Sequence, residues 1–275
     1  MKKIYQKKRA EKKKKTVLMI GMLLAWGMFL FSAVQLWNIY TEYKNGEEEY
    51  DNVRQYAMFT EAPKQEELLQ GEESVGQETK KLSVDFENLK SMNPDTVGWI
   101  HFDGDVQIDY PLVQGTDNEK YLKTTFEGKK NSAGCLFIDF QNDEDFSDRN
   151  TIIYGHNMKN GSMLGRLRKY KNTSFCEENP YFHVYTPNGS LLIYEIFAVS
   201  ILKDSPEYYE KYFENDQKFL DYVERIRGQS LYFKESKIKA TSKIVSLSTC
   251  TNVTPDERLL VQGVLISGSI NDDMK

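Results

Sequence analysis

A cysteine, a histidine and an arginine each stand where a run of strand-forming residues begins or ends. Cys250 ends one such run, and Arg258 begins the next one eight residues later. His156 follows Gly155, directly after a third run at residues 152–154. A thiol, an imidazole and a guanidinium are the groups needed for thiolate attack on an acyl carbon, with the imidazole exchanging protons and the cation supporting the oxyanion. These three residues, called the trio below, are therefore the candidate catalytic set.

The trio is singled out against the other cysteines and histidines of the chain, which has three of each. Cys135 lies inside an apolar run and Cys176 lies between two expected turns, so both are predicted to be inert, buried thiols. His101 and His183 lie within expected strands and are predicted to be structural or surface groups. Cys250 has polar neighbours and a loop after it, which predicts an accessible sulfur.

No metal site or cofactor is expected from the sequence. No C-x-x-C spacing occurs, so the cysteines offer no ligand cluster for zinc. Three cysteines also form no even set, which argues against a disulfide framework.

Arg258 is expected to lie beside Cys250 in a hairpin, because the loop between them is short enough to bring the next strand back next to the thiol. Its planar donors suit an oxyanion better than a lysine would.

The N-terminus predicts a membrane anchor. Residues 1–15 contain nine basic residues and one acid, and residues 16–41 contain no charge. As a helix the uncharged stretch would reach roughly 39 Å, enough to cross a hydrocarbon core of about 30 Å. Residues 1–15 are thus expected to be a cytoplasmic tail and residues 16–40 a single transmembrane helix, with the remainder outside the cell. A cleaved signal peptide is the alternative, but Phe31-Ser32-Ala33 is a poor cleavage site.

The net charge of the part expected outside the cell, after residue 40, argues against nucleic acid as a partner. The net charge of the chain is −5 although its first fifteen residues are strongly basic, so the expected outer part is markedly acidic. It shows no basic cluster of the kind that binds phosphates. The basic tail next to an apolar span is better explained by membrane topology.

A polar, juxtamembrane stalk is expected over residues 41–82, helical before Ala62 and loose after it. Residues 83–275 then read as one mainly β domain. A short helix is expected at residues 84–90 and a second at residues 216–227, where apolar residues recur at helical spacing. Strands are expected at residues 98–102, 106–113, 134–140, 151–154, 182–185, 191–201, 243–248 and 258–266. Asn188-Gly189 predicts a tight hairpin with two positive φ angles. This pattern favours a closed or nearly closed barrel with peripheral helices.

Several motifs of the chain are similar to those of one family. Leu247-Ser248-Thr249-Cys250 with Arg258 resembles the cysteine and arginine signature of the sortases, and Tyr154-Gly155-His156-Asn157 resembles their histidine motif. Residues 93–100 and 110–122, and the helical insert at 216–227, resemble class B members of this family of membrane-anchored cysteine transpeptidases of Gram-positive bacteria. The resemblance covers about residues 83 to 268.

The resemblance implies a sortase β-barrel with its active site in a groove at one edge. It implies that Cys250 attacks the carbonyl after threonine in a C-terminal sorting signal, that His156 protonates the leaving amine, and that Arg258 holds the carbonyl or oxyanion. An amino group of peptidoglycan would then resolve the thioacyl enzyme and join the surface protein to the wall. By motif position, four further residues are expected to contact substrate: Asn118, Leu122, Ser248 and Thr249.

Alternatives are a papain-like cysteine hydrolase and a non-catalytic, wall-associated ectodomain. In papain-like enzymes the cysteine precedes its histidine and opens a helix, whereas here His156 comes first and both residues follow strands. Sorting signals of the Asn-Pro-x-Thr, Leu-Pro-x-Thr and Ser/Pro-Pro-x-Thr types all fit, and the accepting amine can belong to a wall precursor or a pilin.

Overall fold

The computed structural model describes residues 2–61, 80–235 and 238–270. Its helices are α1 (Lys2–Arg54), α2 (Phe86–Met92), α3 (Thr173–Glu178) and α4 (Asp216–Gln229), with short 3-10 helices η1 (Gly104–Val106), η2 (Lys120–Leu122), η3 (Gly165–Lys171) and η4 (Pro206–Tyr208). Its strands are β1 (Ala57–Glu61), β2 (Lys80–Val84), β3 (Thr96–His101), β4 (Asp109–Val113), β5 (Leu136–Ile138), β6 (Asn150–Tyr154), β7 (Tyr181–Tyr185), β8 (Ser190–Lys203), β9 (Ser230–Phe233), β10 (Ile244–Cys250) and β11 (Glu257–Ile270). The chain forms two compact units, of which the second begins at Gly46.

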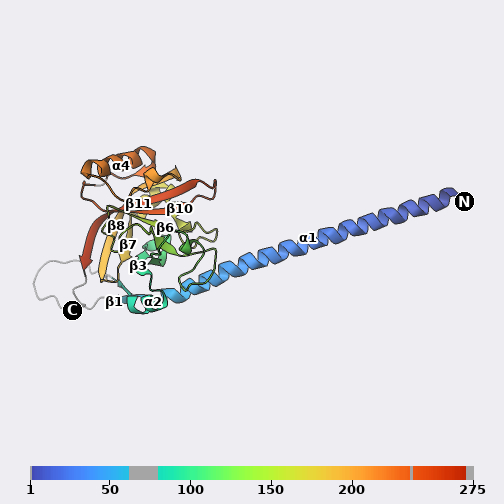
Figure 1. Ribbon diagram of the computed structural model, residues 1–275, viewed down its shortest axis with the longest axis horizontal. Helices are drawn as coiled ribbons and strands as arrows, with labels where there is room; N and C mark the ends of the chain where they lie inside the picture. Colours follow the sequence, from blue (N-terminus) through green and yellow to red (C-terminus); the bar gives the residue numbers. More distant parts are fainter. Residues whose placement is uncertain (1, 62–79, 236–237, 271–275) are drawn as a thin grey trace, which may run out of the picture. The chain divides into compact units, whose positions relative to one another are not determined.

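Eight strands of the second unit close into a barrel (Figure 1). Their order is β10, β6, β5, β4, β3, β7, β8 and β11, and β11 pairs with both β8 and β10, which completes the ring. Most neighbours are antiparallel, but β6 with β10 and β4 with β5 are parallel. β9 is added to β8 outside the ring. The predicted barrel is confirmed.

The residues of β10 alternate between the barrel interior and the outer face. Side chains alternate across a strand, so Val245 and Leu247 share one face, whereas Ile244, Ser246 and Ser248 share the other. All five are buried. Other parts of the protein therefore cover both faces of β10. Cys250 follows Ser248 by two positions, so its side chain lies on the same outer face as those of Ile244, Ser246 and Ser248.

Helix α4 covers the outer face (Figure 1). Asn215 caps its first turn by accepting a hydrogen bond from the backbone nitrogen of Lys218 at 3.0 Å. The helix buries Phe219, Tyr222, Val223 and Ile226 in a cluster with residues of β8, β10 and β11. Burial of such side chains stabilises the fold by about 1.5–3 kcal/mol each. The apolar residues at helical spacing in residues 216–227 therefore form the face by which α4 packs on the barrel.

The turn between β7 and β8 differs in detail from the expected one. Gly189 has φ +81°, but Asn188 is not in the left-handed region. Its Oδ1 instead accepts hydrogen bonds from Thr186 Oγ1 at 2.6 Å and from the backbone nitrogen of Ser190 at 3.0 Å. The prediction of two positive φ angles was wrong, because the asparagine side chain stabilises a different turn.

Helix α1 contains a candidate membrane span. Within Lys15–Arg54, one stretch of 18 residues has a mean hydropathy of 2.2. The large apolar residues from Val17 to Tyr40 are exposed in the first unit. By length and composition this helix can cross a bilayer.

The last two turns of α1 belong to the second unit. Tyr50 and Val53 are buried, and the Tyr50 hydroxyl donates to the carbonyl of Gly134 at 2.5 Å. Glu49 is also buried and accepts a hydrogen bond from the backbone nitrogen of Glu127 at 3.0 Å. Part of the segment expected to be a polar stalk thus packs with the barrel domain. Residues 62–79, expected to be loose, lie outside the described residues.

Candidate active site

The three strands β6, β10 and β11 bring the trio to one edge of the barrel. Cys250 is the last residue of β10, and its cross-strand partner on β11 is Arg258. β6 runs parallel to β10 with Tyr154 beside Ser248. His156 and Cys250 each follow these partners by two residues, so the parallel pairing carries both to the same end of the sheet.

Hydrogen bonds join the chain around His156 to the chain around Cys250. Thr249 Oγ1 donates to the carbonyl of Gly155 at 2.7 Å. The side-chain amide of Asn157 donates to the carbonyl of Cys250 at 2.8 Å, and that of Asn252 donates to the carbonyl of Asn157 at 2.8 Å. These contacts continue the β6–β10 pairing past the strand ends and fix the two loops against each other.

Gly155 is required by close packing. Its φ is not in the left-handed region, so no turn of the backbone requires a glycine here. A Cβ at this position would lie 2.2 Å from Leu136 Cδ2 and 2.8 Å from Leu164 Cγ. The absent side chain therefore lets the loop that carries His156 lie against the barrel.

The ring of His156 donates a hydrogen bond through Nε2. Its Nε2 lies 2.7 Å from the carbonyl oxygen of Leu122. A carbonyl oxygen only accepts hydrogen bonds, so Nε2 carries a hydrogen. Nδ1 is then the ring nitrogen available for proton exchange with a reacting group.

Arg258 is held in place by acceptors of the protein itself. Its Nη2 donates to Asp204 Oδ2 at 2.6 Å, and its Nη1 donates to the carbonyl of Pro255 at 2.8 Å. The Arg258 side chain is 22% exposed. Two different nitrogens of the guanidinium are thus engaged, which fixes its plane beside Cys250.

Cys250 is the accessible thiol of the chain. Cys135 and Cys176 are buried, whereas Cys250 is half-buried. Burial raises the pKa of Cys135 to about 12 and that of Cys176 to about 11, so both stay protonated at neutral pH. The prediction that these two cysteines are buried is confirmed.

The four residues expected to contact substrate differ in how open their side chains are to a ligand. Leu122 is 37% exposed. Asn118 uses both polar atoms within the protein, with Nδ2 donating to Asp139 at 3.0 Å and Oδ1 accepting from the backbone nitrogen of Phe140 at 3.1 Å. Ser248 and Thr249 are each 3% exposed. Of the four, Leu122 thus has its side chain most open to a ligand, and the hydroxyl of Ser248 lies 2.9 Å from that of Tyr209.

Sequence reasoning missed Asp204, Tyr209 and Asn157. Asp204 follows β8, which extends two residues beyond the C-terminal end of the expected strand. Tyr209 lies in the connection from β8 to α4, far from Ser248 in sequence. Of these three residues, only Asn157 is next to a predicted site residue in the sequence. Its position directly after His156 was the one feature that could have indicated a role at the site.

His101 and His183 form a separate polar cluster on β3 and β7, where they are cross-strand partners. His101 Nδ1 lies 3.0 Å from Asp109 Oδ1, and both histidines approach the carboxylate of Asp103. Burial alone would lower the pKa of His101, but hydrogen bonds to Asp103 and Asp109 raise it to about 9. His101 is therefore charged at neutral pH and forms ion pairs with Asp103 and Asp109.

The comparisons with known proteins agree with this geometry. Residues 104–266 match the family model of the sortase domain. Sortase B of Listeria monocytogenes is 33% identical over 249 residues, which cover 89% of this chain and 95% of that protein. The solved structure of sortase B from B. anthracis in complex with AAEK1 has a TM-score of 0.67 and 30% identity, covering 83% of this chain and 100% of that one.

A solved Staphylococcus aureus sortase B–substrate complex is also similar, with a TM-score of 0.62 and 29% identity over 66% of this chain and 84% of that one. Papain-like hydrolysis is not supported, because Cys250 ends a strand and does not open a helix. The family match spans more than half of the chain and includes β6, β10 and β11 as far as Ile266. The chain belongs to the sortase family and, within it, to the class B sortases.

Proposed function

We propose that Cys250 is the nucleophile of this class B transpeptidase, and that His156 and Arg258 are its catalytic partners. The observation that carries the proposal is the strand register, which pairs Cys250 with Arg258 and places His156 two residues beyond the Tyr154–Ser248 pair. A nucleophile, a proton carrier and an oxyanion donor at one strand edge are the set that acyl transfer requires.

The first half-reaction forms a thioacyl enzyme. The thiol proton passes to Nδ1 of His156, and the sulfur bonds to the carbonyl carbon after the threonine of a sorting signal. Arg258 donates hydrogen bonds to the oxyanion that develops. His156 then returns the proton to the leaving amine, and the C–N bond breaks.

The second half-reaction transfers the acyl group to an amine. An amino group of peptidoglycan bonds to the thioacyl carbon and gives a proton to His156. The C–S bond breaks, and His156 passes the proton to the sulfur, which restores the thiol of Cys250. The product is a surface protein joined to the wall through an amide bond, and no cofactor takes part in this scheme.

We expect the full-length protein in detergent to cleave at least one quenched peptide of the Asn-Pro-x-Thr, Leu-Pro-x-Thr or Ser/Pro-Pro-x-Thr type after its threonine. Mass spectrometry of the products identifies the cleaved bond, and an added amine should appear in the product as an amide. Peptides with the same residues in scrambled order are the control. Equal cleavage of scrambled and ordered peptides would contradict the proposal.

We further propose that residues 16–40 anchor the protein in the cell membrane as a single span, with residues 1–15 cytoplasmic and residues 83–275 outside. The apolar part of α1 and the nine basic residues before it support this orientation. The protein is then expected to fractionate with membranes and to keep its N-terminus. A mature form that starts near Val34 in the culture medium would contradict the anchor.

A further inference from the structure

A buried carboxylate lies beside the proposed active site without belonging to the trio. Asp139 directly follows β5 and is 2% exposed. Its Oδ2 accepts hydrogen bonds from Asn118 Nδ2 at 3.0 Å and from the Tyr154 hydroxyl at 3.1 Å, and Oδ1 accepts from the backbone nitrogen of Gln141 at 3.0 Å. An isolated buried charge would be costly, so a partner of opposite charge is needed.

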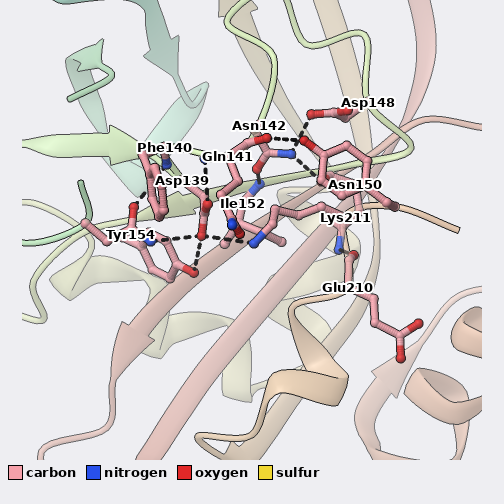
Figure 2. Close-up of polar contacts among 12 residues, drawn as sticks. Asp139, Phe140, Gln141, Asn142, Asp148, Asn150, Ile152, Tyr154, Glu210 and Lys211 are labelled. Carbon is pink, nitrogen blue, oxygen red and sulfur yellow. Dashed lines mark hydrogen bonds and ion pairs between the residues drawn. The ribbon is translucent and has the colours of Figure 1, made fainter. Parts of the chain in front are cut away.

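Lys211 supplies that charge. Its Nζ lies 3.3 Å from Asp139 Oδ2, and its side chain is 13% exposed. Figure 2 shows Lys211 and Tyr154 both turned toward the Asp139 carboxylate. The lysine comes from residues 209–215, which lie between η4 and α4 in neither helix nor strand. The ion pair therefore joins this connection to the barrel.

The whole connection from β8 to α4, residues 204–215, carries two contacts to the active site. Asp204, at its start, binds Nη2 of Arg258 at 2.6 Å. The Tyr209 hydroxyl lies 2.9 Å from that of Ser248, two residues before Cys250 on the same face of β10. Residues 204–215, called the connecting segment below, thus border Cys250 and Arg258.

Among the described residues, one other bond of the connecting segment to the barrel is charged, the Asp204–Arg258 pair, in which the Asp204 side chain is 45% exposed. The two bonds that follow are neutral. Asn150 Nδ2 donates to the carbonyl of Glu210 at 2.8 Å, and the Tyr212 hydroxyl donates to the carbonyl of Gln141. A charge-assisted hydrogen bond is roughly twice as strong as a neutral one. Removing one member of a buried pair also leaves an uncompensated charge. The Asp139–Lys211 pair is therefore the contact whose loss should displace the segment most.

We propose that Asp139 and Lys211 are positioning residues for the transpeptidation reaction. Their ion pair holds the connecting segment against the ends of β6 and β10, so that Asp204 orients Arg258 and Tyr209 supports Ser248. The pair touches no reacting atom and acts through these residues. The kinetic part of this inference rests on the proposed function, whereas the structural part does not.

The test compares Asp139→Asn, Lys211→Met and the double variant in the full-length protein. Lys211→Met is the milder change, because Asp139 keeps its three other donors. Each variant is titrated with a small alkylating reagent to count reactive Cys250, and peptide kinetics are expressed per titrated thiol. We expect kcat/KM to fall about ten-fold or more in each single variant, with the alkylation rate within about two-fold of wild type. Hydrogen exchange should accelerate in residues 204–215.

The double variant decides whether the two residues act as one interaction. We expect it to lose no more activity than the more affected single variant, whereas additive losses would overturn the proposal. Lys234→Met is the matched control, because Lys234 forms a partly buried pair with Glu195 at 2.6 Å on a different part of the barrel. It should leave kcat/KM per thiol unchanged.

Two further outcomes separate this inference from the proposed function. If wild type cleaves no sorting peptide, the proposed function fails, and hydrogen exchange of the connecting segment still tests the ion pair. Unchanged exchange in residues 204–215 of both single variants would overturn the positioning role. Faster exchange throughout the barrel, with unchanged kcat/KM per thiol, would show a purely structural pair and would also overturn it.

Discussion

Replacing Cys250 by alanine is expected to abolish cleavage of a sorting peptide and leave the barrel folded. The sulfur is the atom that would bond to the acyl carbon, and no neighbour can replace it in that step. Cys250 is half-buried at the end of β10, so little packing is lost. We expect a change in the free energy of unfolding within about 0.5 kcal/mol, as for other partly exposed positions. Peptide turnover and thermal unfolding of the same sample measure both effects.

Cys176→Ala provides the opposite pattern as a control. Cys176 is fully buried in α3, so its loss should lower stability through a small cavity while turnover persists. Turnover by Cys250→Ala comparable with that of wild type would show that another group is the nucleophile.

Arg258→Lys is expected to slow acylation by about 10²-fold or more, the range found when an oxyanion donor is lost. Lysine keeps the charge, but its single nitrogen cannot bind Asp204 and the carbonyl of Pro255 and also present a planar donor pair to substrate. The deficit should fall mainly on kcat, because the lost contact strengthens only as the oxyanion forms. Single-turnover acylation measures this step directly.

Arg227→Lys is the matched control for the arginine. Arg227 forms exposed ion pairs with Glu224 and Glu235 on and after α4, away from the trio. Such pairs contribute little, so acylation should proceed at the wild-type rate. If Arg258→Lys also acylated at that rate, Arg258 would be a solvated surface charge with no part in the reaction.

The strands that build the site could be predicted because their residue types carry the information locally. The runs at residues 151–154, 243–248 and 258–266 are rich in β-branched residues between polar breaks, and they became β6, β10 and β11 with small changes at their ends. The trio was predicted from the same boundaries. The structure brings the strand ends together, and the roles of the side chains stay predictions until they are measured.

The surroundings of the trio could not be predicted, because they depend on contacts between distant segments. Nothing in the residues near Lys211 indicates that it pairs with Asp139, and the connection from β8 to α4 has no periodic pattern. The end of α1 was misleading for a different reason. Its sequence is mostly charged, and only the spacing of Tyr50 and Val53, which share one helix face, indicates that it packs on the domain.

The parallel pairing of β6 with β10 has a consequence for how the enzyme folds. Tyr154 and Ser248 are neighbours in the sheet but lie far apart in the chain, and closing so long a loop costs entropy that local contacts cannot offset. β11 must also pair with both β8 and β10 before the ring is complete. In a newly made chain the thiol therefore cannot meet the imidazole until β10 has been synthesised and has paired with β6. The reactive centre depends on one of the longest-range pairings of the barrel and cannot form from the N-terminal strands alone.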